Sequence, residues 1–235
     1  MNAGARPALA RWVLERPASV VAPDLLGCLL QTEGILARIV EVEAYEQSEP
    51  AAHTFRGPTP GNATMFCPAG RLYTYFTYGM HWCANVVTGS AGQGEAVLLR
   101  AARLLEGEQV ARARRGARPS DRDLLRGPAR LAQALGLDGD ADGTDLLADD
   151  APLRLLPRDA DPSAISTGPR VGVRLAADLA WRFWVTDDPL VSAYKRHPKA
   201  APTPPRPPAR SGPPSSLPAE LRDPGLGRGR SAQAG

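Results

Sequence analysis

A short run near the start of the chain brings two carboxylates and an aromatic ring together. Residues 38–45 read Arg-Ile-Val-Glu-Val-Glu-Ala-Tyr. Side chains alternate between the two faces of a strand, so Glu41, Glu43 and Tyr45 share one face, and the apolar residues between them lie on the other. A carboxylate beside an aromatic ring suits a pocket in which a base activates water next to a flat ligand. This run is therefore the first candidate for chemistry.

Residues 72–85 concentrate flat and hydrogen-bonding side chains. Three of the chain's five tyrosines lie there with His81, Trp82 and Asn85, although aromatic residues make up only 6% of the chain. Such a mixture suits recognition of a planar heterocycle such as a nucleobase, which is held by stacking and read at its edges. A strand in the core is the simpler alternative, because tyrosine and phenylalanine favour strands.

The elements that must position these residues form an α+β pattern. Period-two runs predict strands at 35–45, 72–78, 81–88, 95–103, 170–175 and 181–186. Helical patterns lie at 19–30, 106–115 and 121–136, and the aspartate-rich residues 138–161 are predicted to be an exposed loop. We expect a single compact domain in which helices flank a curved, mostly antiparallel β-sheet.

Length and composition favour one domain with two tails. The chain has 235 residues, of which 43% are hydrophobic, enough for a substantial core. We expect disorder in residues 1–10, the domain in residues 11–196, and a disordered tail rich in Pro, Arg and Gly in residues 197–235. That tail carries six basic and two acidic side chains while the whole chain has a net charge of +3, so the domain itself is not basic.

Localisation and mechanism are also bounded by what the sequence contains. No run of eighteen apolar residues and no signal peptide is evident, which favours a cytoplasmic protein without a membrane partner. Lys195 and Lys199 are the two lysines among 28 basic residues. A P-loop and Schiff-base chemistry both need a lysine, and residues 1–194 contain none. Activated water is therefore the expected nucleophile.

Metal sites and disulfides have little support. Cys28, Cys67 and Cys83 form no Cys-x-x-Cys pair and are expected to be structural. His53 could be combined with Glu41 and Glu43 as metal ligands, but no His-x-x-x-His or Glu-x-x-His spacing supports such a site. No cofactor is expected.

A set of motifs occurs in a specific order along residues 14–196. They are Arg-Ile-Val-Glu-Val-Glu-Ala-Tyr at 38–45, Ala-Ala-His at 51–53, Met-Phe with Pro68 and Gly70 at 65–70, Leu-Tyr-Thr-Tyr-Phe-Thr-Tyr-Gly-Met-His-Trp-Cys-Ala-Asn at 72–85, Val-Leu-Leu-Arg at 97–100 and Arg-Val-Gly-Val at 170–173. With these motifs the sequence resembles the alkyladenine (3-methyladenine) DNA glycosylases, monofunctional enzymes of base-excision repair. One departure is Cys67, where relatives with Met-Phe-Gly-Pro carry glycine.

The resemblance implies a hydrolytic mechanism in which Glu43 is the general base. It would polarise a water that attacks the anomeric carbon of a flipped-out nucleotide as the base departs. Arg100 and the backbone carbonyl of Val171 would hold that water. Glu41 would be a structural or electrostatic neighbour, paired with an arginine.

The resemblance also implies how the damaged base is held. Tyr45 would stack on one side of it and His53 with Tyr75 on the other, while Asn85 would crowd the exocyclic amine of undamaged guanine. Tyr78 would be the wedge that fills the gap left in the duplex. The implied substrate is double-stranded DNA containing alkylated or deaminated purines, bound by a monomer associated with the nucleoid, and no lyase activity is expected.

Alternatives remain for the function and for single residues. The protein could be a damage-binding protein without turnover, or a metal-dependent hydrolase. Tyr78 could be a core aromatic at a strand end, Asn85 a turn or cap residue, and His53 a structural histidine. Arg100 could simply pair with Glu41.

Overall fold

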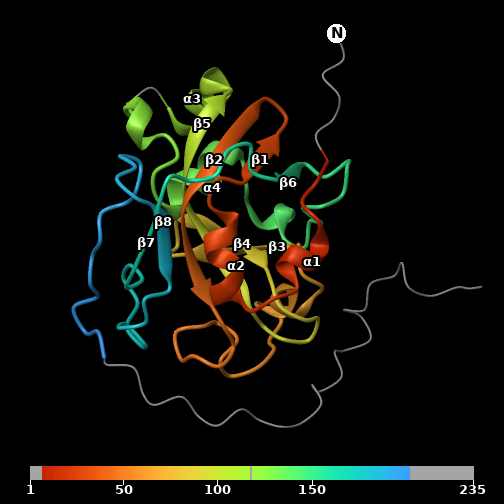
Figure 1. Cartoon of the computed structure of the whole chain (residues 1–235), viewed down its shortest axis with the longest axis vertical. Coiled ribbons are helices and arrows are strands. Elements are labelled where there is room, and N and C mark those ends of the chain that lie inside the picture. The colour runs from red at the N-terminus through yellow and green to blue at the C-terminus, as the bar shows by residue number, and fades with distance from the viewer. Residues whose placement is uncertain (1–6, 117, 202–235) are drawn as a thin grey trace, which may run out of the picture.

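Two long antiparallel strands, β2 (Ile35–Tyr45) and β5 (Ala96–Glu106), form the centre of the fold (Figure 1). The computed structural model describes residues 7–116 and 118–201. All strands pair antiparallel in the order β3-β4-β5-β2-β1-β6, and β8 joins the second half of β2 and pairs with β7. The remaining strands are β1 (Leu29–Thr32), β3 (Leu72–Thr77), β4 (His81–Val87), β6 (Leu153–Leu156), β7 (Ile165–Gly168) and β8 (Arg182–Val185). The predicted single α+β domain with a curved antiparallel sheet is confirmed.

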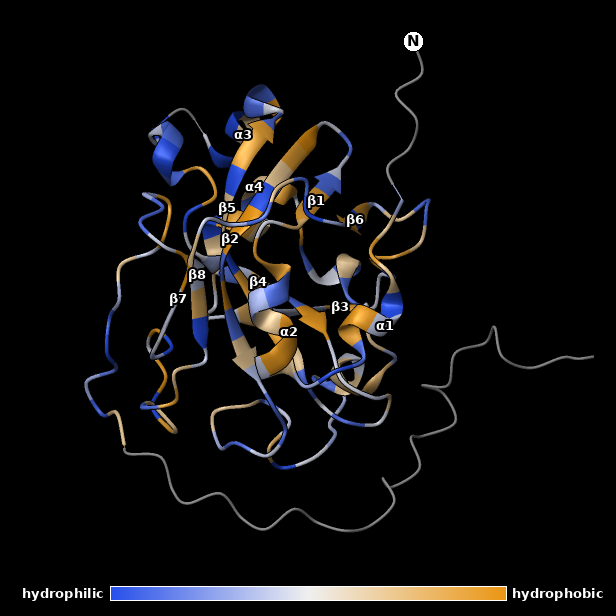
Figure 2. Cartoon of the chain, viewed as in Figure 1, coloured by the Kyte–Doolittle hydropathy of each residue, from blue (hydrophilic) through white to orange (hydrophobic). Residues whose placement is uncertain are grey.

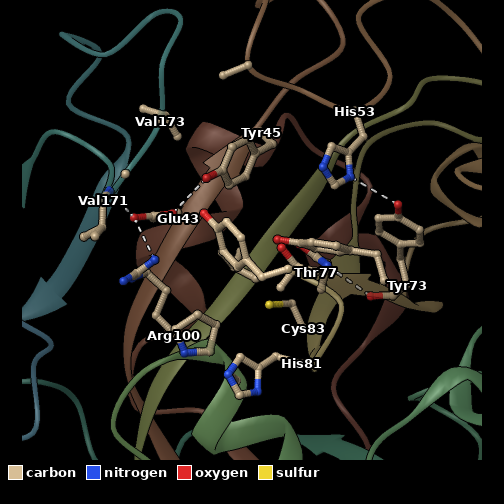
Figure 3. Close-up of a pocket in the computed structure, with 18 of the residues that line it drawn as sticks. Glu43, Tyr45, His53, Tyr73, Thr77, His81, Cys83, Arg100, Val171 and Val173 are labelled. Atoms are coloured by element: carbon tan, nitrogen blue, oxygen red, sulfur yellow. Dashed lines mark hydrogen bonds and ion pairs between the residues drawn. The ribbon is translucent and has the colours of Figure 1, made fainter. Parts of the chain in front are cut away.

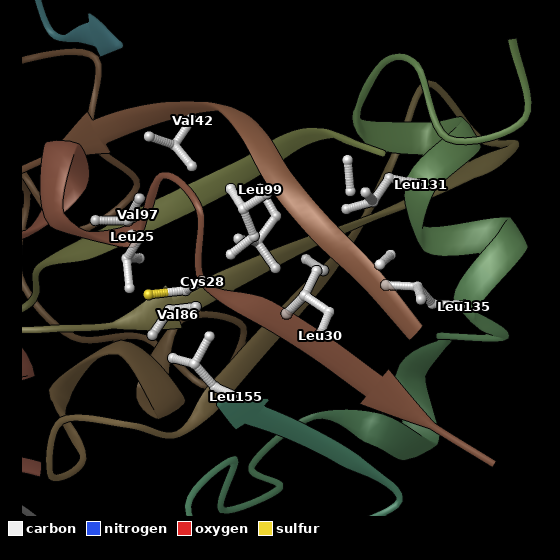
Figure 4. Close-up of a cluster of buried hydrophobic side chains, with 14 of the residues drawn as sticks. Leu25, Cys28, Leu30, Val42, Val86, Val97, Leu99, Leu131, Leu135 and Leu155 are labelled. Carbon is white, nitrogen blue, oxygen red and sulfur yellow. The ribbon is translucent and has the colours of Figure 1, made fainter. Parts of the chain in front are cut away.

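Short helices cover this sheet and enclose the core. They are α1 (Arg11–Leu14), α2 (Ala18–Leu25), α3 (Glu108–Arg115) and α4 (Pro128–Leu135), with 3₁₀ turns η1 (Ala63–Phe66), η2 (Asp121–Asp123) and η3 (Gly139–Ala141). Apolar residues gather on α2 and the central strands, whereas the outer turns are hydrophilic (Figure 2). Leu25 of α2 and Leu131 of α4 belong to one buried cluster with Val42, Val97 and Leu99 of the two long strands (Figure 4).

A register shift in β2 decides which of its side chains face the core. The pairing with β5 is irregular on both sides of Glu41. Before the shift, the core side chains are odd-numbered, such as Ile39; after it they are even-numbered, Val42 and Ala44. A bulge of this kind adds one residue to a strand, so the residues that follow it point to the opposite face from the one that the alternation before it would give. Glu43 therefore points away from the core.

The predicted helix over residues 19–30 is wrong in its second half. Helix α2 ends at Leu25, and β1 follows from Leu29. Gly27 separates the two in a left-handed conformation with a φ of 86°, which glycine adopts without a steric penalty. Its amide donates to the carbonyl of Ile39 in β2, so the chain turns into the sheet instead of continuing the helix.

Two predictions between residues 138 and 175 also fail. Residues 138–161 are not an exposed loop throughout, because β6 lies within them, fully buried and paired with β1. Residues 170–175 form a turn and not a strand: Arg170 is buried in an ion pair with Glu49, and Gly172 has a φ of 71°. The strand before it is β7, which the sequence analysis did not predict.

The other predicted elements are found, β2 with the predicted ends and the rest with shifted ends. Five predicted strands correspond to β2, β3, β4, β5 and β8, and the helices predicted at 106–115 and 121–136 correspond to α3 and the shorter α4. Most of both predicted disordered tails lies outside the described residues. No helix within residues 7–116 and 118–201 is long and apolar enough to cross a membrane.

Candidate active site

A pocket of about 490 Å³ opens between the C-terminal half of β2, the β3–β4 hairpin and the turn after β7. Its lining contains the eight residues that the resemblance implies in catalysis, base binding or intercalation: Glu43, Tyr45, His53, Tyr75, Tyr78, Asn85, Arg100 and Val171. Figure 3 shows Glu43 with Arg100 and Val171 at one end and His53 with Tyr73 at the other. The fold thus gathers side chains separated by more than a hundred residues.

Glu43 is fully buried and held by three donors. Its Oε1 accepts the backbone amide of Val171 at 2.7 Å and lies 3.2 Å from Nη1 of Arg100. Its Oε2 accepts the hydroxyl of Tyr45 at 2.9 Å. A carboxylate offers about four lone-pair directions, so these contacts leave one for a further donor, on Oε2. Such an arrangement fixes the carboxylate and keeps an acceptor for water.

Behind Glu43 lies a second buried carboxylate, Glu41, which contacts two arginines. Its Oε1 accepts hydrogen bonds of 2.8 Å from Nε of Arg100 and Nε of Arg182. Burial raises the pKa of Glu41, but the two guanidiniums and the donors of Ser192 outweigh it and lower the pKa below its ordinary value. We call Glu41, Glu43, Arg100 and Arg182 the carboxylate–arginine cluster, whose two negative and two positive charges balance.

Arg100 bridges the two carboxylates of this cluster. Burial opposes its charge, but Glu43 and Glu41 raise the pKa of the guanidinium above its ordinary value. The pairing of Arg100 with Glu41 is therefore real, but it does not exclude a contact with Glu43, because different nitrogens serve the two partners.

The ring of Tyr45 forms one wall of the pocket. The guanidinium of Arg170 lies over it, 4.5 Å from the ring centroid, and is itself paired with Glu49. Burial, together with the charge of Glu43, raises the pKa of the Tyr45 hydroxyl well above its ordinary value, so it stays protonated and donates to the carboxylate. The ring is thus held by Glu43 at its hydroxyl and by Arg170 over one face.

The opposite wall is made of His53 and Tyr75, whose rings are perpendicular. Their centroids are 4.6 Å apart with an interplanar angle of 85°, and His53 Nδ1 lies 3.2 Å from the Tyr73 hydroxyl. Partial burial lowers the pKa of His53 below its ordinary value, which favours the neutral ring. Because the two rings are perpendicular, one can offer its face to a flat ligand while the other offers an edge.

Two further residues are placed clearly by the hairpin. Tyr78 is 86% exposed at its tip, with a φ of 52°, so it is not a core aromatic. A non-glycine residue in this conformation costs about 1–2 kcal/mol. Asn85 lies within β4, buried, and its Nδ2 donates to the carbonyl of Tyr73 at 3.1 Å, so it is neither a turn nor a cap residue.

The sequence analysis assigned no site role to two further side chains of the pocket lining, Lys195 and Cys83. Lys195 lies at the exposed rim, because its carbonyl accepts the amide of Gly172 beside Val171. The lack of lysine in residues 1–194 therefore did not exclude a pocket lysine. Cys83 is buried near Tyr75, and burial raises the pKa of its thiol. Its place in the aromatic segment, two residues before Asn85, was a signal that could have identified it.

The metal-site alternative does not match this geometry. Both oxygens of Glu41 already accept hydrogen bonds from Arg100, Arg182 and Ser192, and His53 contacts Tyr73 at the other end of the pocket. Among the described residues no group of three His, Cys, Asp or Glu side chains is arranged to hold a metal ion.

A family of known proteins matches most of this sequence. The sequence model of the family described as methylpurine-DNA glycosylase (MPG) matches residues 12–189. The chain belongs to the methylpurine-DNA glycosylase family. The match includes Glu43, Arg100 and the aromatic walls, and it ends before Ser192 and Lys195.

Curated bacterial members of the methylpurine-DNA glycosylase family resemble this chain over most of their length. A protein of Burkholderia lata is 49% identical over 187 residues, which are 78% of this chain and 90% of the relative. One of Leifsonia xyli subsp. xyli is 51% identical over 191 residues, 76% and 88% of the two chains, and one of Streptomyces avermitilis is 46% identical over 200 residues, 82% and 94%. Each is named "Putative 3-methyladenine DNA glycosylase".

Proposed function

We propose that this protein is a DNA-repair glycosylase that removes alkylated or deaminated purines from double-stranded DNA and leaves an abasic site. The observation that carries the proposal is the buried Glu43 carboxylate, held by three donors and facing an aromatic pocket. A volume of about 490 Å³ is in the range that suits a small planar ligand. Family membership and the names of the relatives support the same activity.

In this mechanism Glu43 accepts a proton from water on the free side of Oε2. The water oxygen forms a bond to the anomeric carbon, the N-glycosidic bond breaks, and its electron pair leaves with the purine. Arg100 and the carbonyl of Val171 orient the water. Because the carboxylate is negative, it also stabilises the positive charge that develops on the sugar.

Recognition uses the two walls of the pocket. The flipped base lies between Tyr45 and the perpendicular pair of His53 and Tyr75, and Asn85 disfavours guanine. Tyr78 projects from the hairpin tip and occupies the gap that the nucleotide leaves in the duplex. Unstacking costs a few kcal/mol, and an exposed aromatic ring at that place offsets part of it. The protein works as a cytoplasmic, nucleoid-associated monomer.

Excision in the presence of a chelator tests this function. Duplex oligonucleotides with one hypoxanthine, ethenoadenine or 3-methyladenine are incubated with the protein and with Glu43→Gln, and free base and alkali-labile sites are measured. We expect base release by the parent, about 10²–10⁴ times less by Glu43→Gln, and no strand cleavage before alkali. Tight binding without release of base from any lesion would instead indicate a damage-binding protein. Loss of activity in the presence of the chelator would indicate a metal-dependent hydrolase.

The pocket lysine makes the expected absence of lyase activity a separate test. Lys195 is exposed at the rim, whereas Schiff-base lysines are usually desolvated to lower their affinity for a proton. We therefore expect no covalent complex when borohydride is added to protein and abasic DNA. A trapped complex that disappears in Lys195→Ala would show lyase chemistry and contradict the monofunctional mechanism.

A further inference from the structure

Residues 188–192, which follow β8, are held against the back of the pocket by a series of arginines. Asp188 pairs with Arg103, and backbone carbonyls farther along accept hydrogen bonds from three more arginines, Arg122, Arg126 and Arg182. Residues 188–192 lie in no helix or strand, so these arginine contacts hold the segment in place. Its last residue, Ser192, lies within the carboxylate–arginine cluster.

Every polar group of Ser192 has a partner in this cluster. Its amide donates to Glu41 Oε2 at 2.7 Å, and its hydroxyl donates to Glu41 Oε1 at 2.8 Å. The same hydroxyl accepts a hydrogen bond of 3.0 Å from Nη2 of Arg100. Its carbonyl accepts Nη2 of Arg182 at 2.6 Å. Ser192 therefore connects both arginines to the buried carboxylate.

The contacts of Arg100 show what this connection does. Nε contacts Glu41, Nη1 contacts Glu43, and Nη2 contacts Ser192, so each nitrogen of the planar guanidinium has a different partner. With a single contact the planar guanidinium could pivot about that contact, whereas two fixed contacts set its orientation. The Ser192 hydroxyl is the second fixed contact, and with Glu41 it directs Nη1 toward Glu43.

We propose that Ser192 is a positioning residue for base excision, which acts by fixing the guanidinium of Arg100 against Glu43. The proposal rests on the proposed function, in which these two side chains hold the attacking water. It assigns a role in the chemical step to a residue beyond the segment that the family model matches. DNA binding, which uses the aromatic walls and the hairpin tip, should not depend on the serine hydroxyl.

Single-turnover excision and DNA affinity of Ser192→Ala provide the first test. The substitution keeps the backbone contacts and removes the bridging oxygen. Loss of a hydrogen bond to a charged group should slow excision about tenfold, with the dissociation constant for lesion DNA unchanged within about twofold. Ser192→Thr keeps the hydroxyl and should restore the parental rate. Ser166→Ala removes a hydroxyl bonded to Thr186 outside the pocket and should leave both quantities unchanged.

A double-mutant cycle separates positioning from general weakening of the fold. In an Arg100→Lys background no planar guanidinium remains for Ser192 to orient, so the added Ser192→Ala should slow excision by less than about twofold. An additional tenfold loss there, or an equal loss of affinity and rate in Ser192→Ala alone, would overturn the proposal. Glu43→Gln is measured in parallel: if it keeps the parental rate, the proposed mechanism fails, whereas an inactive Glu43→Gln with a fully active Ser192→Ala refutes the role of Ser192 alone.

Discussion

The carboxylate–arginine cluster and the tip of the β3–β4 hairpin border the same pocket but hold their side chains in opposite ways. In the cluster, both carboxylates are fully buried and each oxygen has at least one partner. At the hairpin tip, the large side chains of Phe76, Tyr78 and Met80 are 52%, 86% and 66% exposed. One region is ordered by charge and hydrogen bonds, and the other presents apolar surface to solvent.

This difference matches the two tasks of the proposed reaction. A chemical step gains when charged groups are fixed in advance, away from water. Opening a duplex instead needs apolar side chains that can enter between stacked bases. We therefore expect substitutions in the cluster to affect stability and chemistry, and substitutions at the tip to affect DNA binding.

The largest effect on stability is expected for Glu41→Gln. Removing this charge leaves Arg100 and Arg182 buried without their shared partner, which typically costs about 3–5 kcal/mol. Urea unfolding at neutral pH measures it. Asp161→Asn is the matched control, because its ion pair with Arg158 lies at the surface and should contribute little. Equal, small effects of the two substitutions would mean that the cluster does not stabilise the fold.

A smaller and different effect is expected at the hairpin tip. Tyr78→Ala should weaken binding of lesion duplex about tenfold, since the ring no longer offsets the cost of unstacking. Its free energy of unfolding should not fall, because the parental side chain is exposed to solvent. Phe55→Ala removes another exposed aromatic, outside the pocket lining, and should leave affinity unchanged. A loss of affinity shared by both variants would argue against a wedge.

Parts of both regions could be predicted from the sequence. The alternation of residues 38–45 placed Glu41, Glu43 and Tyr45 on one face, and the structure agrees: after the register shifts that flank Glu41, the even-numbered Val42 and Ala44 face the core. The aromatic strand and its hairpin were equally visible. Such features are local: they depend on periodicity and on residues close in sequence.

The features that the sequence did not reveal depend on contacts between residues far apart in the chain. The turn at Arg170 is set by a buried ion pair with Glu49, 121 positions away, which overrides the strand propensity of the segment. The roles of Ser192 and Lys195 follow from docking of residues 188–195 against β2 and the turn after β7. Neither residue belongs to a pattern, so their positions could only come from the fold.

The pH dependence of stability sharpens the comparison further. The pKa of Glu41 is lowered in the folded state, so its contribution to stability is complete above its unfolded pKa of about 4.5 and is lost as the pH falls through the folded value. Unfolding free energies measured between pH 6 and pH 3 should therefore decrease less steeply for Glu41→Gln than for the parent. Parallel curves would show that Glu41 is not the group responsible.

The smallest expected effect is on the salt dependence of DNA affinity and concerns the rim of the pocket. Lys195 is exposed at the pocket rim, and we expect its ammonium group to contact one phosphate of the bound DNA. Lys195→Ala should lower the salt slope of DNA affinity by about one, as expected for the loss of one phosphate contact. Lys199, the other lysine, is exposed outside the pocket lining, so Lys199→Ala is the control and should keep the parental slope.

The division between chemistry and DNA engagement is tested most directly by single-turnover base release from a lesion in duplex and in single-stranded DNA. We expect Glu43→Gln to bind both substrates with parental affinity and to release base from neither at a measurable fraction of the parental rate. Tyr78→Ala should lose rate or affinity on the duplex but match the parent on the single strand, where no stacked gap must be filled. Parental base release by Glu43→Gln, or an equal defect of Tyr78→Ala on both substrates, would contradict the account.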